Sequence, residues 1–309
     1  MDNGAGSLPL NPTPVASNKQ EYPILAHAAT GPATESAMPL RSFAFWRFLL
    51  ALLVVGGAIP QARATWSIIA VHPRTGTIGV AAASCSGGVF GIQSVAPGTG
   101  AVIVQAESNN DARREAMQML REHASPEAIL ARISDPVAGF SPQRQQYAVF
   151  ANATNAPPRI YTGTEVPAIN GHATGEYFSV QGNTLASEQV IASAAAALGK
   201  ADWQDDLAMA HALMRALKAG AAAGGDRRCG QAASNTAFIS LHRATDPPDA
   251  PWVSLSVNRI PAGTASATDA LDSLFARWLR EDLQQPSTAI FVVPEASATV
   301  TPAQATLPR

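Results

Sequence analysis

A threonine at position 65 follows a segment that resembles a signal-peptidase site, with small side chains at Ala62 and Ala64. Cleavage after Ala64 would leave Thr65 with a free α-amine, a group that titrates at about pH 8. A threonine hydroxyl is a weak nucleophile that needs a base, and a terminal amine on the same residue can supply one. Thr65 is therefore a candidate catalytic residue, although threonine is also an ordinary strand residue after such a site.

Two further segments contain polar groups that suit a catalytic site. In YFSVQGN an expected strand ends at Asn183, which can donate to an oxyanion; a turn that uses the backbone freedom of glycine and asparagine is the preferred alternative. In GGDRRCGQ the glycines end a long helix and place Asp226 and Arg227 on a tight loop. This carboxylate and guanidinium can orient a terminal amine or bind a substrate carboxylate, or they can pair in a purely structural loop.

The cysteine and histidine patterns exclude other chemistries. Cys85 and Cys229 are too few for a disulfide framework, and their spacing leaves open whether they form one bridge. A nucleophilic Cys85 or Ser84 has no recognisable His–Asp partner, so a buried thiol or a disulfide is preferred. The six histidines are scattered singly, and no phosphate loop or dinucleotide fingerprint is present. The sequence therefore predicts no metal and no cofactor.

Composition allows a sizeable core and argues against one class of partner. The chain has 309 residues, of which 47% are hydrophobic, and a formal net charge of −2. No basic block or stripe is present, so we expect no nucleic acid partner.

The first 64 residues are predicted to precede the folded domain. Residues 1–37 are rich in Pro, Ala, Ser and Asn and predict a disordered extension, with Met38 as an alternative start. Residues 38–64 combine two arginines with an apolar run shorter than the ~20 residues of a membrane span, which indicates a signal peptide. We therefore expect a periplasmic or secreted protein with no membrane contact after cleavage. An uncleaved anchor is the alternative.

The pattern after Ala64 predicts the elements that position these residues. Two strands apolar on both faces, 65–72 and 77–84, flank a Pro–Gly turn and indicate a hairpin covered on both sides. Further strands are expected at 92–96, 101–106, 145–151, 177–180, 234–242 and 252–257, and helices at 110–123, from 126, at 188–198, 204–222 and 266–283. A Pro-, Gly- and Asn-rich connection separates residues 151 and 177, and the tail from residue 284 is weakly patterned. Because strict βαβ alternation is absent, two stacked sheets with helices outside are expected.

Three segments together resemble the family called domain of unknown function 1028: TWSIIAVHPRTGTIGVAAAS, YFSVQGNTL and AAGGDRRCGQAA. The resemblance extends from Thr65 to about Leu279. It implies the fold of the N-terminal nucleophile (Ntn) hydrolases, an α+β four-layer αββα sandwich of two mainly antiparallel sheets, in a domain spanning 65–283. If Cys85 and Cys229 are bridged, the bridge ties two loops together beside the expected site.

The resemblance also implies a function. Ntn hydrolases cleave amide bonds with a terminal Thr, Ser or Cys, and Thr65 lies at the matching place. The sequence therefore predicts an exported amidohydrolase with a small amide or peptide-like substrate, in which Asn183 or backbone N–H groups hold the oxyanion and Asp226 and Arg227 orient the amine or bind a carboxylate. Ntn-type domains often assemble into homo-oligomers, but the sequence leaves the oligomeric state open. The alternatives are a ligand-binding module without turnover and a membrane-tethered structural protein.

Overall fold

A computed structural model describes residues 65–152, 156–261 and 265–281, together with the backbone of 287–292. All of these lie within one compact unit, residues 60–309. The predicted extension and signal peptide, residues 1–64, lie outside the described residues.

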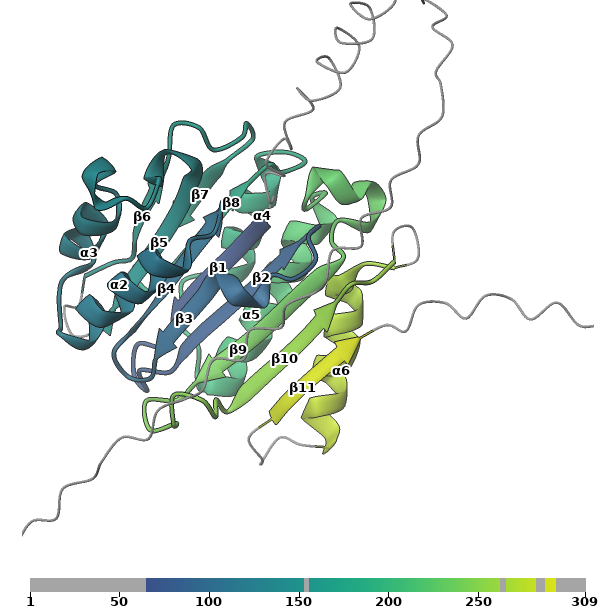
Figure 1. The fold of residues 1–309 in the computed structure, drawn as a ribbon. Coiled ribbons are helices and arrows are strands. Elements are labelled where there is room, and N and C mark those ends of the chain that lie inside the picture. Colours follow the sequence, from purple (N-terminus) through teal and green to yellow (C-terminus); the bar gives the residue numbers. More distant parts are fainter. Residues whose placement is uncertain (1–64, 153–155, 262–264, 282–286, 293–309) are drawn as a thin grey trace, which may run out of the picture. The chain divides into compact units, whose positions relative to one another are not determined.

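The first sheet has seven strands in the order β11-β10-β9-β2-β1-β8-β7 (Figure 1). Its neighbouring strands are antiparallel except for the edge pair β10–β11, which is parallel. The strands are β1 Thr65–Val71, β2 Ile78–Ser84, β7 Gly171–Thr174, β8 Phe178–Asn183, β9 Thr236–His242, β10 Val253–Asn258 and β11 Ser287–Val292. The predicted hairpin, β1 and β2, is thus central and lies between β8 and β9.

The second sheet has four antiparallel strands in the order β3-β4-β5-β6. Its strands are β3 Gln93–Ala96, β4 Gly100–Ala106, β5 Gln145–Ala151 and β6 Arg159–Thr162. The helices are α2 Asn110–Arg121, α3 Pro126–Ile133, α4 Gln189–Leu198, α5 Asp206–Ala222 and α6 Ala267–Glu281. Short 3-10 helices lie at Phe90–Ile92, Pro136–Ala138, Pro142–Arg144 and Arg227–Ala232.

Three apolar clusters define four layers. One joins α4, α5 and α6 to the seven-stranded sheet, a second fills the space between the two sheets, and a third joins α2 and α3 to the four-stranded sheet. The predicted α+β sandwich, with stacked, mainly antiparallel sheets and helices outside, is therefore confirmed.

The helices begin where side chains satisfy free backbone N–H groups. Asn109 accepts from Asp111 N and Ala112 N at the start of α2, and Asp205 accepts from Ala208 N at the start of α5. Ser125 accepts from Ala128 N in front of the proline that opens α3. Within the described ranges, no helix combines the length and the hydropathy needed to cross a bilayer.

Alternation along β1 sets the environment of the candidate nucleophile. Trp66 and Ile68 face the helices, whereas Ile69 and Val71 face the second sheet. Because successive side chains of a strand point to opposite faces, Thr65 and Ser67 face the space between the sheets.

Three strands differ from the sequence prediction. β6 and β7 lie in the connection between residues 151 and 177, where no strand was predicted, and β11 lies in the C-terminal segment for which little regular structure was predicted. β6 and β7 have only four residues each and are partly exposed, so they give a weak apolar alternation.

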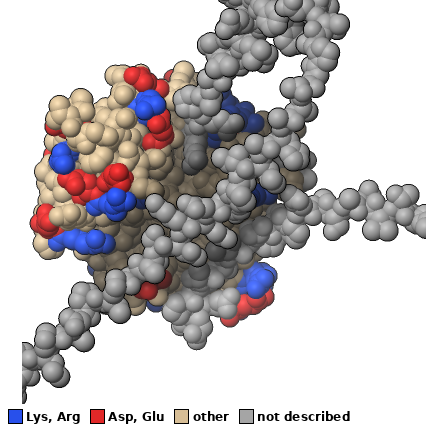
Figure 2. Space-filling model, in the orientation of Figure 1, with Lys and Arg blue, Asp and Glu red and all other residues tan. Residues whose placement is uncertain are grey.

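The surface carries charges of both signs. On the face seen in Figure 2 acidic and basic side chains lie side by side. Arg114 pairs with Asp111 at 2.5 Å and Arg132 with Glu115 at 2.7 Å, on helices α2 and α3. Such exposed pairs contribute little to stability.

Candidate functional site

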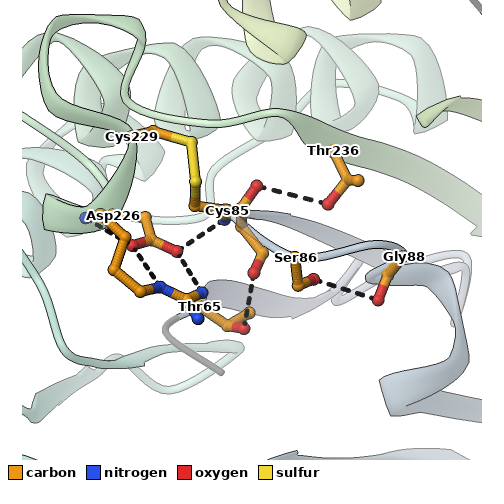
Figure 3. Close-up of polar contacts among 9 residues, drawn as sticks. Thr65, Cys85, Ser86, Gly88, Asp226, Cys229 and Thr236 are labelled. Carbon is orange, nitrogen blue, oxygen red and sulfur yellow. Dashed lines mark hydrogen bonds and ion pairs between the residues drawn. A yellow bond between two sulfur atoms is a disulfide. The ribbon is translucent and has the colours of Figure 1, made fainter. Parts of the chain in front are cut away.

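Thr65 is the first residue of β1 and lies between two neighbouring strands. It pairs with Ser84 of β2 on one side and with Asn183 of β8 on the other. Its side-chain hydroxyl donates to Ser84 Oγ at 3.3 Å, and the residue is only 2% exposed (Figure 3). The structure thus places the candidate nucleophile at the end of a central strand, on the face between the two sheets.

Asn183 ends β8 directly beside Thr65. It is fully buried, and neither atom of its side-chain amide has a hydrogen-bond partner among the described residues. An unpaired buried polar group costs about 1–3 kcal/mol, so this amide has hydrogen-bonding capacity left for a water molecule or a ligand. The preferred turn interpretation was wrong, because Gly182 and Asn183 both pair within the β1–β8 ladder and the positive φ of 52° falls on Thr184.

Asp226 connects the two strands that flank Thr65. Its fully buried carboxylate accepts the backbone N–H of Cys85, directly after β2, at 2.6 Å. Its backbone forms a bridge to Leu185, two residues after β8. The carboxylate also accepts from Arg228, through the backbone N–H at 3.0 Å, Nε at 3.1 Å and Nη2 at 2.7 Å. Asp226 therefore holds the ends of β2 and β8 in place around the start of β1.

The guanidinium that lies against Asp226 belongs to Arg228, so the self-paired loop that the sequence left open as an alternative forms with the second arginine and not with Arg227. Asp226 caps the 3-10 helix Arg227–Ala232, and the residue two places after a cap can return its N–H and side chain to the capping carboxylate. Arg227 is exposed, and its backbone N–H reaches Thr184 O at 3.4 Å. Asp226 is thus buried rather than displayed on the loop.

A disulfide joins Cys85 to Cys229, with 5.6 Å between their Cα atoms (Figure 3). The bridge that the sequence left open is present, and Cys85 is not a free thiol nucleophile. It crosslinks the end of β2 to the loop that contains Asp226, so one covalent bond and one charged hydrogen bond connect the same two segments. The glycines after Cys85 face open space, since an added Cβ at Gly87 or Gly88 would meet nothing within 4 Å.

Polar side chains also line the space between the sheets behind Thr65, and of these only Gln181 lies in a segment singled out from the sequence for its polar groups, YFSVQGN. Ser67, Gln105, Gln146 and Gln181 are fully buried and hydrogen-bonded to one another. A signal was present in the alternation of polar residues along residues 179–183 and 65–67, on one face of each strand.

The described residues offer no cluster of three or more metal-ligating side chains. A cavity of about 1010 Å³ lies between residues 90–95 and α2, and it is lined in part by Gln93, Arg114 and His242. Neither Thr65, Asn183 nor Asp226 lines it. The polar grouping at the start of β1 is therefore separate from this hollow.

The fold and this grouping define a class: an α+β sandwich of two sheets with a polar, disulfide-linked site at the first residue of a central strand. The chain belongs to the family of unknown function DUF1028, whose model matches residues 65–266. The match begins at Thr65.

Among solved structures, the chain is similar to the crystal structure of protein SPO2555 from Silicibacter pomeroyi, which is assigned to the same family model. The two are 25% identical, and the alignment covers 71% of this chain and 88% of that chain with a TM-score of 0.57. No curated protein matches the chain.

Proposed function

We propose that this protein is an exported Ntn-type amidohydrolase that acts on a small amide or peptide-like substrate. In this proposal a signal peptide at residues 38–64 is removed, and Thr65 becomes the amino terminus of the periplasmic or secreted enzyme. The arrangement of Thr65 and Asn183 supports the proposal most strongly. A hydroxyl at the start of a strand lies in register with a buried amide that has no described partner.

The acylation step uses only groups at this strand end. The neutral α-amine of Thr65 takes the hydroxyl proton while Oγ1 attacks the substrate carbonyl carbon. The carbonyl π electrons move to oxygen, and the oxyanion accepts a hydrogen bond from Asn183 Nδ2. The tetrahedral centre then collapses, the C–N bond breaks, and the leaving nitrogen takes the proton from the terminal ammonium. The products of this step are an ester on Thr65 and a free amine.

Deacylation returns the site to its starting state. The α-amine accepts a proton from water, the hydroxide attacks the ester carbonyl, and the ester C–O bond breaks to release a carboxylic acid. The threonine oxygen recovers the proton. Asp226 and Arg228 act as positioning residues here, because they hold the strand ends on both sides of Thr65. Arg227, at the exposed side of the same loop, is available to a substrate carboxylate.

The test compares chains that differ only at the amino terminus. A protein beginning at Thr65 should hydrolyse members of a panel of small amides, with kcat rising as the pH passes the pKa of the terminal amine. A chain that keeps Ala64, and the Thr65→Ala variant, should each lose at least about a thousandfold in kcat/KM. Thr164→Ala, which removes an exposed threonine hydroxyl, is the matched control and should keep full activity.

Other results would change the assignment. If the natural amino terminus of the exported protein is not Thr65, the base is absent and the mechanism fails. If the processed protein binds amides without turnover, and Thr65→Ala binds them equally well, the protein is a ligand-binding module.

A further inference from the structure

A continuous chain of buried side chains crosses between the sheets behind Thr65. Gln181 Nε2 donates to Ser67 Oγ at 2.7 Å, and Ser67 Oγ donates to Gln105 Oε1 at 2.6 Å. Gln105 Nε2 donates to Gln146 Oε1 at 2.7 Å, and Gln146 Nε2 donates to Thr162 Oγ1 at 2.9 Å. This hydrogen-bonded chain starts in β8 of the first sheet and ends at β6, an edge strand of the second sheet.

The far end sets the direction of every bond in the chain. Gln146 Nε2 also donates to the backbone carbonyl of Gly171 at 3.3 Å, and a carbonyl can only accept. The nitrogen of Gln146 must therefore face that carbonyl, and its oxygen faces Gln105. Each following bond then has one possible direction, because a reversed amide would bring two oxygens or two N–H groups together.

The end of this hydrogen-bonded chain that is nearer to Thr65, at Gln181, is consequently an acceptor. With its nitrogen committed to Ser67, Gln181 presents Oε1, which is buried and has no partner among the described residues. Gln181 pairs with Ser67 in the β1–β8 ladder, and Asn183 pairs with Thr65. The two pairs are two residues apart along each strand and share one face, which places Gln181 roughly 6–7 Å deeper than Asn183.

We propose that Gln181 Oε1 determines substrate specificity by accepting a hydrogen bond from an uncharged N–H group on the acyl part of the substrate. This inference rests on the proposed function. The groups that form the hydrogen-bonded chain are neutral, so nothing in it offsets the cost of burying an ammonium group, and a carboxylate has no proton to offer an acceptor oxygen. A primary carboxamide whose nitrogen lies five bonds from the carbonyl carbon that Thr65 attacks fits both the chemistry and the spacing, which makes a glutaminyl amide the expected substrate class.

Access to Gln181 depends on opening of the site. The residue is fully buried in the 309-residue chain. A trapped water is the competing partner for Gln181 Oε1, and the experiment distinguishes the two.

The experiment uses two ligands that differ in one group. The side chain of N-acetylglutaminamide ends in a neutral carboxamide, whereas the side chain of N-acetylisoglutamine ends in a carboxylate. Binding is measured by calorimetry on the Thr65→Ala variant of the processed protein, and ammonia release is measured on the processed protein with Thr65 intact. Each measurement should favour N-acetylglutaminamide over N-acetylisoglutamine by at least about tenfold. Equal binding of the two ligands, or binding of neither, would overturn the proposal.

Two variants test the origin of the preference. Gln181→Met removes the acceptor with little change in volume. It should reduce the preference for N-acetylglutaminamide over N-acetylisoglutamine to within about twofold. Ser67→Ala releases the nitrogen of Gln181 and lets the amide reverse. It should therefore lower the same preference without removing Gln181, and it replaces the Gln181→Met test if that variant does not fold. Gln189→Met, at an exposed position of α4, is the matched control and should keep the wild-type ratio. An unchanged ratio in folded Gln181→Met would assign the acceptor to water.

The two proposals fail in different ways. If the carboxamide is preferred in binding but no amide is hydrolysed by the chain with a free Thr65, the specificity role holds and the hydrolase assignment fails. If other amides are hydrolysed and neither ligand binds, the hydrolase assignment holds and the role of Gln181 fails.

Discussion

At the scale of single residues, burial controls the charge of His242. It ends β9, is 6% exposed, and neither ring nitrogen has a partner among the described residues. Burial lowers the pKa of His242 to about 4, and the nearby Asp246 carboxylate opposes this only in part. The ring is therefore neutral in the folded protein at neutral pH.

This depressed pKa predicts a loss of stability in mild acid. The unfolded chain protonates His242 below about pH 6.5, and the folded chain only below about pH 4. Between these values the unfolded state binds more protons, so the free energy of unfolding falls as the pH decreases, by a total of roughly 3 kcal/mol. Urea unfolding at pH 7 and pH 4.5 should show this loss in wild type and in His172→Gln, an exposed control, and a smaller loss in His242→Gln. An equal loss in all three proteins would assign the acid sensitivity to other groups.

The sequence pointed to some residues of the candidate site and could not point to others for a physical reason. Thr65 was found because a cleavage pattern and a strand pattern meet there. Arg228 was missed because two adjacent arginines in a short loop are equivalent in sequence, and only the 3-10 geometry after Asp226 turns the second one back. The direction of Gln181 depends on a carbonyl of another strand, which no local pattern contains.

At the scale of elements, α5 approaches β1 closely because of one glycine. A Cβ at Gly220 would lie 2.6 Å from Trp66 Nε1, closer than side chains can pack. Trp66 is fully buried and precedes Ser67 on the opposite face of β1. The distance between helix and strand next to the candidate site therefore depends on the absence of a side chain at this position.

Gly220→Ala should destabilise the protein although it improves helix propensity. Propensity alone would stabilise α5 by about 1 kcal/mol, whereas overpacking against Trp66 should cost about 2–3 kcal/mol, at the upper end of the usual range, so the net loss should be about 1–2 kcal/mol. Chemical denaturation decides the sign. Ala219→Gly, the reverse change one residue earlier, should cost only the propensity difference of about 1 kcal/mol, and a rise in stability of Gly220→Ala would show that α5 moves freely away from Trp66.

Element prediction succeeded where burial was complete. β1, β2, β4 and β5 are buried along their whole lengths, so their apolar runs were visible in the sequence. The edge strands β6 and β7 depend on pairing with a neighbour rather than on their own pattern. For the same reason the sequence predicted the two stacked sheets but not the edge strands β6, β7 and β11.

At the scale of the whole molecule, the Cys85–Cys229 bridge closes a loop with a sequence separation of 144 residues. A crosslink over so long a segment restricts the unfolded chain strongly, and loss of such a bond typically costs 2–5 kcal/mol. The loop contains every element from β3 to α5. The bond therefore joins the residue after β2 to the loop that contains Asp226, two segments beside the candidate site that are far apart in the sequence.

Reduction of the bridge should lower the free energy of unfolding by roughly 2–5 kcal/mol. Urea unfolding of wild type with and without a thiol reductant measures this difference. The double variant Cys85→Ser with Cys229→Ser should match the reduced protein and show no response to the reductant. A reductant effect that persists in the double variant would contradict the assignment to this bond.

The same bridge decides how the protein would respond to a pulling force at its two ends. Tension would pass from residue 85 to residue 229 through the two sulfur atoms, so the segment between them would bear no load. Strands β1, β2, β9, β10 and β11 and helix α6 would be drawn out first, while the four-stranded sheet, strands β7 and β8 and helices α2 to α5 would stay within the closed loop. At about 3.6 Å per extended residue, roughly 500 Å of chain would be released only when the bond is cut.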